Sequence, residues 1–293
     1  MTTTSLPPVF ACPVCDTSLS RDESTLRCGN GHPFDVAREG YVNLLLAQHR
    51  RSKDPGYSKE MIAGRRDFFA AGHYQRLADG IAELITAYLP APGAAQVVID
   101  AGCGEGYYLR RLRHRLAVDG RDERTVLCGT DISKHGIRMA ARHDPAGQYA
   151  VASTYRLPVP AGIADVLLTQ FSPMSAEDFR RAVKPGGIVL VGGPAPGHLY
   201  SFKQLLYETA QRHDPADTLA DEPGFTLVEA HPIRYPLAVR GAGQVANLLL
   251  MTPYFWSADQ ATRARLAVLE QLDTEVDVVV HAYRRTPADA SVS

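Results

Sequence analysis

Three cysteines and a histidine near the start of the chain have the spacing of a zinc site. Cys12, Cys15, Cys28 and His32 follow the pattern C-x2-C-x12-C-x3-H. Two short chelating pairs separated by a loop supply the thiolate and imidazole ligands that a tetrahedral zinc ion takes. Because the protein would fill all four positions, we expect zinc to stabilise a small finger over residues 1–46. The alternative is a set of reduced cysteines beside an unrelated histidine.

A second group of residues has the pattern of a loop that binds a nucleotide-like ligand. The stretch DAGCGEGYY begins at Asp100, directly after a β-branched run, and a segment of helical periodicity follows it. A glycine loop between a strand and a helix is where doubly wound sheets bind such ligands. Gly102, Gly104 and Gly106 give D-x-G-x-G-x-G, which differs from the G-x-G-x-x-G of dinucleotide-binding proteins.

Two acidic residues narrow the choice of ligand. Asp100 ends its strand at the glycine loop, where a carboxylate suits an ammonium group better than a pyrophosphate. Asp131 ends the next β-branched run, where a carboxylate accepts hydrogen bonds from ribose hydroxyls. Together with the glycines, these acids predict a pocket for S-adenosylmethionine, whereas a glycine loop alone could be an ordinary tight turn.

The rest of the chain has the pattern of an α/β sheet that could position these residues. Runs of β-branched residues alternate with segments of helical periodicity, which favours a mostly parallel sheet with helices on both faces. The last two runs suit an antiparallel pair at one edge of that sheet. The expected strands are 96–101, 125–130, 148–152, 164–170, 187–192, 226–235 and 275–284.

The same patterns predict the domain organisation. Residues 47–90 hold a polar, basic linker and then two helices separated at Gly72. We expect the sheet domain over residues 91–285 and a disordered tail over residues 286–293.

Charge and hydropathy exclude some classes of function. The 293 residues include 31 lysines and arginines against 32 acids, so the protein as a whole has no excess of charge that would attract nucleic acid. No apolar run approaches the roughly 20 residues of a membrane-spanning helix, and the N-terminus lacks a signal-peptide pattern. We therefore expect a cytoplasmic protein with no membrane partner.

Positive charge is concentrated in two segments. Between residues 48 and 66 there are six lysines and arginines against two acids, and we expect Arg50, Arg51 and Lys53 to contact RNA phosphates. Four arginines between Arg110 and Arg115 form a second candidate. The alternative in both cases is a solvated face of the protein.

These motifs, in this order, resemble the RlmA (RrmA) family of 23S rRNA guanine-N1 methyltransferases, which includes a macrolide-resistance subgroup. The resemblance extends from Cys12 to about Arg285. It rests on the zinc motif, the glycine loop and the stretches REGYVNLL, QHRRSKDPGYS, AGHY and MTPYFW.

The resemblance implies a fold, a reaction and an assembly. The fold would be a seven-stranded, mostly parallel, Rossmann-like methyltransferase sheet behind the zinc finger. The reaction would transfer a methyl group from S-adenosylmethionine to N1 of one guanine in a stem-loop of 23S ribosomal RNA, and the protein would be a homodimer. The resemblance also implies that Tyr74, Glu105 and His198 lie at the cofactor, with Gly104 and Asp131.

The turn Phe171-Ser172-Pro173 follows the fourth strand of the expected sheet domain. Open α/β sheets bind ligands at this end of their strands, so we expect Phe171 and Pro173 to bind an extruded base. The alternative is that Phe171 closes the core. Family members have Tyr-Ala-Pro at this turn, and the difference leaves the target guanine open.

The catalytic base and two other functions remain open at this point. Guanine N1 carries a proton at neutral pH, which a base must remove, and no residue of the sequence is singled out for that role. A small-molecule (natural-product) methyltransferase that retains the finger as a scaffold is one alternative. A non-catalytic, zinc-dependent RNA-binding module is another, and the complete glycine loop with both acids argues against it.

Overall fold

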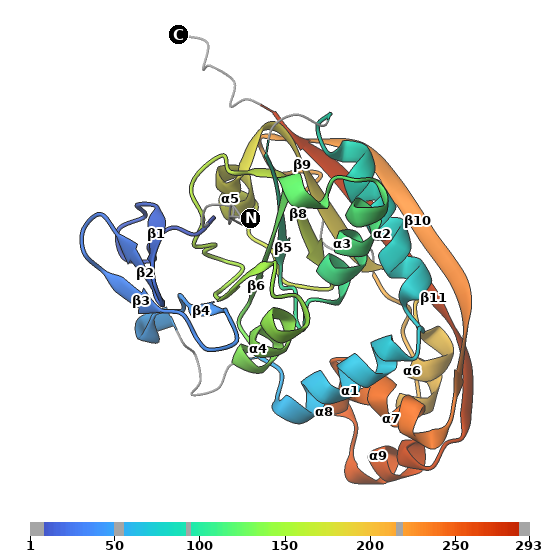
Figure 1. Ribbon diagram of the computed structural model, residues 1–293. Coiled ribbons are helices and arrows are strands. Elements are labelled where there is room, and N and C mark those ends of the chain that lie inside the picture. Colours follow the sequence, from blue (N-terminus) through green and yellow to red (C-terminus); the bar gives the residue numbers. More distant parts are fainter. Residues whose placement is uncertain (1–8, 50–55, 92–94, 215–218, 287–293) are drawn as a thin grey trace.

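The computed structural model describes residues 9–49, 56–91, 95–214 and 219–286, and it has the expected α/β architecture (Figure 1). Over these residues the main sheet has eight strands in the order β10-β11-β9-β8-β5-β6-β7-β4. These strands are β4 (Val42–Asn43), β5 (Gln96–Ala101), β6 (Thr125–Asp131), β7 (Gln148–Val151), β8 (Ala164–Gln170), β9 (Val183–Pro194), β10 (Phe225–Arg240) and β11 (Gln271–Arg285).

The seven expected strands are all present, and an eighth was missed. Strands β5 to β9 pair in parallel, while β11 runs antiparallel to β9 and β10 antiparallel to β11, as the sequence predicted for this edge. The additional strand, β4, has only two residues and pairs in parallel with β7. It continues the sheet because Leu44 N donates to Val151 O at 3.0 Å, a long-range contact without a local sequence signal.

Residues of the central strand β5 alternate between two apolar layers, as pleated strands require. Val98 packs among the residues of the helices that cover one face of the sheet. Val97 and Ile99 pack on the other face, against one helix and the N-terminal segment. The helices on the first face include α1 (Lys59–Ala70), α2 (Gln75–Tyr88), α3 (Tyr107–Val118), α4 (Lys134–His143) and α6 (Tyr200–Leu206), and the helix on the second is α5 (Ala176–Ala182).

A long hairpin, β10 and β11, borders the sheet and has helices between its strands (Figure 1). These helices are α7 (Ala242–Leu250), α8 (Tyr254–Ser257) and α9 (Gln260–Ala267). Helix α7 packs against α1, so the C-terminal part of the chain meets the helices that precede the sheet. No helix among the described residues combines the length and the apolar character needed to cross a bilayer.

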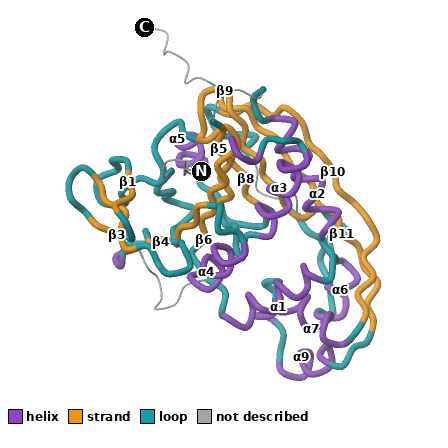
Figure 2. Tube along the Cα trace, in the orientation of Figure 1, coloured by secondary structure: helices purple, strands orange, loops and turns teal. Residues whose placement is uncertain are grey.

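The N-terminal segment forms a separate antiparallel sheet of β1 (Leu19–Asp22), β2 (Thr25–Cys28) and β3 (Pro33–Asp35), at the left of Figure 2. Its apolar residues belong to the same buried cluster as the second face of the main sheet. Ala11 N donates to Pro158 O at 2.7 Å, which joins the segment before β1 to the loop between β7 and β8. The finger therefore covers a face of the main sheet.

Candidate functional site

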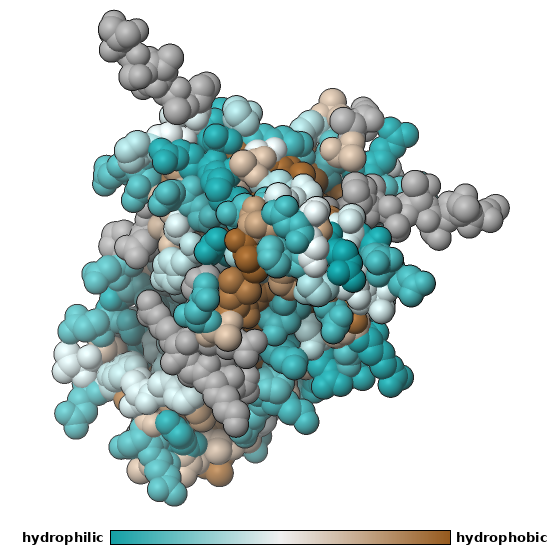
Figure 3. Space-filling view, turned by 90° about the vertical axis from the view of Figure 1, so that its left-hand side faces the viewer, coloured by the Kyte–Doolittle hydropathy of each residue, from teal (hydrophilic) through white to brown (hydrophobic). Residues whose placement is uncertain are grey.

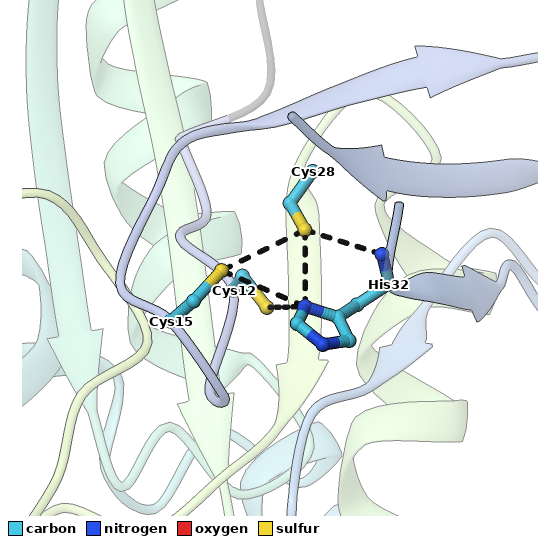
Figure 4. A group of neighbouring side chains, drawn as sticks. All are labelled: Cys12, Cys15, Cys28 and His32. Carbon is cyan, nitrogen blue, oxygen red and sulfur yellow. Dashed lines mark hydrogen bonds between the residues drawn. The ribbon is translucent and has the colours of Figure 1, made fainter. Parts of the chain in front are cut away.

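The four expected metal ligands meet in one cluster (Figure 4). The Sγ atoms of Cys12 and Cys15 each lie 3.6 Å from His32 Nδ1, and Cys28 Sγ lies 3.3 Å from it. The Sγ atoms of Cys15 and Cys28 are 3.7 Å apart. A tetrahedral zinc ion with bonds of about 2.3 Å to sulfur and about 2.0 Å to nitrogen would separate its ligands by about 3.5 to 3.8 Å. The cluster therefore fits zinc, and all four positions belong to the protein.

Local backbone geometry holds these ligands in place. Gly31 has a φ of +83°, and its N–H donates to Cys28 O at 2.9 Å, which closes the second knuckle. The backbone N–H of His32 donates to Cys28 Sγ at 3.3 Å (Figure 4). Hydrogen bonds from Thr17 lower the pKa of the Cys15 thiol to about 6, which favours the thiolate that binds metal.

The glycine loop lies between β5 and α3, as the sequence predicted. Gly102, Gly104 and Gly106 all have positive φ angles, of +91°, +57° and +79°. A Cβ atom on Gly102 would collide with the Ser172 hydroxyl, so the loop directly abuts the turn after β8. Only glycine combines this backbone conformation with so close an approach.

Asp100 is a buried carboxylate without a hydrogen-bond partner among the described residues. It is 1% exposed, and both of its oxygens are unpartnered there. Burial raises its pKa to about 7; the Arg65 charge opposes this shift and Asp131 adds to it. An unpartnered buried charge is costly, and such groups are concentrated where a ligand completes the site.

Asp131 has a structural role that the sequence did not predict. Its Oδ2 accepts from Gly104 N at 2.9 Å and its Oδ1 accepts from Ser133 N at 2.7 Å. Burial raises the pKa of this carboxyl group, and the two N–H donors oppose the shift. Asp131 thus secures the glycine loop, and each oxygen keeps a lone pair for a further donor.

A cavity of about 480 Å³ opens beside the glycine loop. Both Arg65, which lies over Gly104, and Ser172, which lies against Gly102, line it. Its walls are largely aromatic and apolar and come from segments far apart in the chain. They include Phe69, Tyr74, Phe171, Pro173, His198, His213, Met251 and Tyr254.

Phe171 lies at the mouth of this cavity and does not close the core. It is 38% exposed, and its ring stacks on that of His198 with centroids 5.3 Å apart. Its φ of +54° is uncommon for a residue with a bulky side chain. The strain is stored where β8 ends, beside the cavity, which is typical of a ligand-binding position.

Tyr74 and His198 also meet in the cavity, although 124 residues separate them. The Tyr74 hydroxyl lies 3.3 Å from His198 Nε2, and the backbone N–H of Asp277 donates to His198 Nδ1 at 3.2 Å. Burial lowers the pKa of His198 to about 3, so this imidazole is neutral.

Comparison with known proteins shows which family the chain belongs to. One family model, described as RlmA, N-terminal, matches residues 10–53, and another, described as methyltransferase domain, matches residues 99–191. The 23S rRNA (guanine(748)-N(1))-methyltransferase of Streptomyces fradiae is 34% identical over 257 residues, covering 87% of this chain and 88% of the relative. The provisionally named 23S rRNA (guanine-N(1)-)-methyltransferase of Micromonospora griseorubida is 34% identical over 287 residues, with 90% and 92% covered. That of Bacillus subtilis is 33% identical over 277 residues, with 92% and 95% covered.

The chain belongs to the family of 23S rRNA guanine-N1 methyltransferases. Its zinc ribbon and its S-adenosylmethionine-dependent methyltransferase fold are those the sequence predicted. In this member of the family, the ribbon and the sheet share a buried core.

Glu105, in the glycine loop, has a fully buried side chain that pairs with Arg110 at 2.8 Å. The other arginines of α3 are also paired with acids. They are Arg111 with Asp79, Arg113 with Asp144 and Arg115 with Asp119. Each arginine of the second basic segment therefore has an acidic partner within the protein.

Two residues of the site had been overlooked in the sequence. Arg65, counted there with the basic linker, lies over the glycine loop: its guanidinium carbon is 3.5 Å from the position of a Cβ on Gly104. Its Nε is buried without a partner among the described residues. His213 lines the cavity, and no local motif surrounds it. A count of charges could not separate Arg65 from its neighbours, because only the packing of α1 places it there.

Some predicted residues lie outside the part of the chain that the structure describes. They are Arg50, Arg51 and Lys53 and nearly all of the tail at 286–293. Asp165, at the start of β8, has a structural role: it accepts from Val97 N at 2.8 Å and pairs with Lys184 at 2.7 Å.

Proposed function

We propose that this enzyme transfers a methyl group from S-adenosylmethionine to N1 of a guanine in a stem-loop of 23S ribosomal RNA. One observation carries the proposal. A buried carboxylate without a hydrogen-bond partner, Asp100, and a guanidinium with a buried, unpartnered Nε, Arg65, flank a glycine loop beside an aromatic cavity.

The donor fits the residues around this loop. The methionine part of S-adenosylmethionine carries an ammonium and a carboxylate. The ammonium would pair with Asp100 and the carboxylate with Arg65, whose buried polar atoms have no hydrogen-bond partner among the described residues. We assign the ribose hydroxyls to the remaining lone pairs of Asp131. The three glycines allow the backbone to approach the donor closely. We also assign Tyr74 and His198, which line the cavity, to the donor.

The acceptor base fits the part of the cavity that the turn after β8 lines. We propose that the target guanine leaves its stack and inserts beside Phe171 and Pro173, where aromatic and apolar walls replace its neighbours in the RNA. Because Ser172 of this turn abuts Gly102, the base would lie close to the donor loop.

The bound donor supplies an electrophilic methyl group on a sulfonium. The protein's part is to align N1 of guanine with that methyl group and to remove the N1 proton. The apolar walls exclude water from the reacting atoms, which strengthens every polar contact to the base.

We further propose that Arg50, Arg51 and Lys53 contact phosphates of the RNA, because they belong to a basic segment of a nearly neutral chain. The resemblance to the family supports a homodimer, action in the cytoplasm and a role in macrolide resistance. It also supports the division into a finger, a linker with two helices and a methyltransferase domain.

The test uses purified protein, labelled S-adenosylmethionine and 23S RNA that lacks the modification. We expect label in the RNA, N1-methylguanosine in its nuclease digest, and a reverse-transcription stop at one guanine, because an N1 methyl blocks base pairing. Label in a small molecule but not in RNA would contradict the proposal.

A further inference from the structure

Two histidines face the cavity, and their hydrogen bonds give them opposite properties. The ring centroids of His198 and His213 are 6.1 Å apart, and both residues line the cavity. Burial lowers the pKa of each ring, so both are neutral near pH 7. A neutral imidazole has one N–H donor and one acceptor nitrogen, and its neighbours decide which is which.

His198 cannot accept a proton from the substrate at Nε2. The backbone N–H of Asp277 donates to its Nδ1, so Nδ1 is the acceptor nitrogen. The ring proton of the neutral form is therefore on Nε2, which faces the Tyr74 hydroxyl at 3.3 Å. His198 presents a hydrogen-bond donor to its surroundings.

His213 has the reverse arrangement. Its ring donates a hydrogen bond to the backbone of His198, a contact that raises its pKa against the effect of burial. Its Nε2 lies 2.9 Å from the Tyr254 hydroxyl. Burial raises the pKa of Tyr254, so that hydroxyl keeps its proton and donates it to Nε2. Nε2 of His213 is therefore an acceptor nitrogen, and the Tyr254 hydroxyl occupies its lone pair.

We propose that His213 is the general base that removes the N1 proton of the target guanine. This inference rests on the proposed function, since it names the group that the same site needs. In the reaction, Nε2 of His213 takes the N1 proton, the electrons left on N1 form the bond to the methyl carbon, and the carbon–sulfur bond breaks. The sulfur keeps that electron pair and leaves as a neutral thioether.

The position of His213 supports this role. The donor loop meets the cavity at Ser172, through Gly102. His213 packs on Tyr254, which belongs to the segment between β10 and β11, with ring centroids 6.5 Å apart and nearly parallel rings. The guanine would replace the Tyr254 hydroxyl as the partner of Nε2.

The charges around His213 favour its neutral form. After burial, the next influence that lowers its pKa is the positive charge of Lys203, from α6. The backbone of His198 and the carboxylate of Asp214 act in the opposite direction, and the neighbouring Tyr254 is uncharged. The balance keeps the pKa of His213 below its ordinary value of 6.5. A base of this kind is already deprotonated at the pH of the reaction.

The test compares methyl transfer by wild type, His213→Gln and the exposed control His231→Gln under single-turnover conditions. We expect the rate constant of His213→Gln at pH 7.5 to fall by about 100- to 10,000-fold, the usual contribution of a general base. The wild-type rate should level off above about pH 7, whereas the variant's should keep rising to pH 9, as guanine ionises unaided. Free imidazole should restore part of the activity of His213→Ala.

Two control measurements on His213→Gln accompany the rate measurements. S-adenosylhomocysteine affinity and thermal unfolding should match those of wild type, because His213 does not touch the donor loop. The role of His213 would be overturned if His213→Gln keeps the wild-type rate constant and its plateau above pH 7. It would also be overturned if the rate falls, imidazole does not restore it and the pH dependence is unchanged. A wild-type reaction without N1-methylguanosine would instead refute the proposed function itself.

Discussion

Replacing Asp100 with Asn should stabilise the donor-free protein at neutral pH and weaken its binding of the methyl donor. The carboxylate is buried, and neither of its oxygens has a hydrogen-bond partner among the described residues. A neutral amide of the same shape avoids most of the cost of burying that charge. It cannot provide a full negative charge for an ammonium group.

The size of the stability effect follows from the pKa of Asp100, which burial raises from 3.8 to about 7. A shift of about three units corresponds to about 4 kcal/mol, at 1.36 kcal/mol per unit. Because the folded protein binds this proton more tightly than the unfolded chain, the penalty is absent below about pH 4 and complete above about pH 7. The buried amide has a smaller cost of its own, so we expect Asp100→Asn to be more stable by about 2–4 kcal/mol at pH 8.

Urea unfolding of both proteins at pH 4.5 and pH 8 measures this difference, and calorimetry with S-adenosylhomocysteine measures donor affinity. Loss of the charged partner should weaken the affinity by about 1.5–3 kcal/mol, or roughly 10- to 150-fold. Asp165→Asn is a matched control in a neighbouring strand: it breaks the pair with Lys184 and should lower stability. The reasoning is refuted if Asp100→Asn is no more stable than wild type at pH 8, or if its advantage is equal at both pH values.

Three further predictions concern the metal, the donor and the RNA. Cys28→Ser should lose zinc by elemental analysis and lower the melting temperature of the whole chain, because the ribbon and the main sheet share a core; full zinc content would exclude the site. Arg65→Met should weaken S-adenosylhomocysteine about tenfold or more but leave 5′-methylthioadenosine, which lacks the carboxylate, unaffected; equal losses would place the carboxylate elsewhere. Replacing Arg50, Arg51 and Lys53 with Ala should reduce the log–log salt slope of RNA binding by about two to three units; parallel slopes would remove these residues from the interface.

The parts of the site that the sequence predicted are those built from neighbours in the chain. The two cysteine pairs of the ribbon and the glycine loop each form within a few residues, so spacing alone indicates their geometry. The seven predicted strands were confirmed for a related reason, because alternation and β-branched runs are local signals of a pleated, buried strand. Strand β4 was missed because two residues are too few to show a period.

The roles of individual residues in the site could not be predicted from the sequence, because they depend on contacts between distant segments. From spacing, Asp131 was assigned to ribose, but only the fold shows that both of its oxygens also hold loop amides. Arg65 counted as one of six basic residues in a linker until the packing of α1 placed it over Gly104. The arginines of α3 looked like a basic surface until their acidic partners, up to 32 residues away, were visible.

The sequence by itself determined the class of the protein: a zinc ribbon, a methyltransferase sheet and a donor loop between its first strand and the helix that follows. Only the tertiary structure decided how the acceptor cavity is built, because Tyr74, Phe171, His198, His213 and Tyr254 reach it from five separate segments. Which nitrogen of each histidine carries the proton depends on backbone groups of other segments. The physical reason is that short-range periodicity encodes which face of an element is buried, whereas the meeting of side chains in a cavity depends on how distant elements pack.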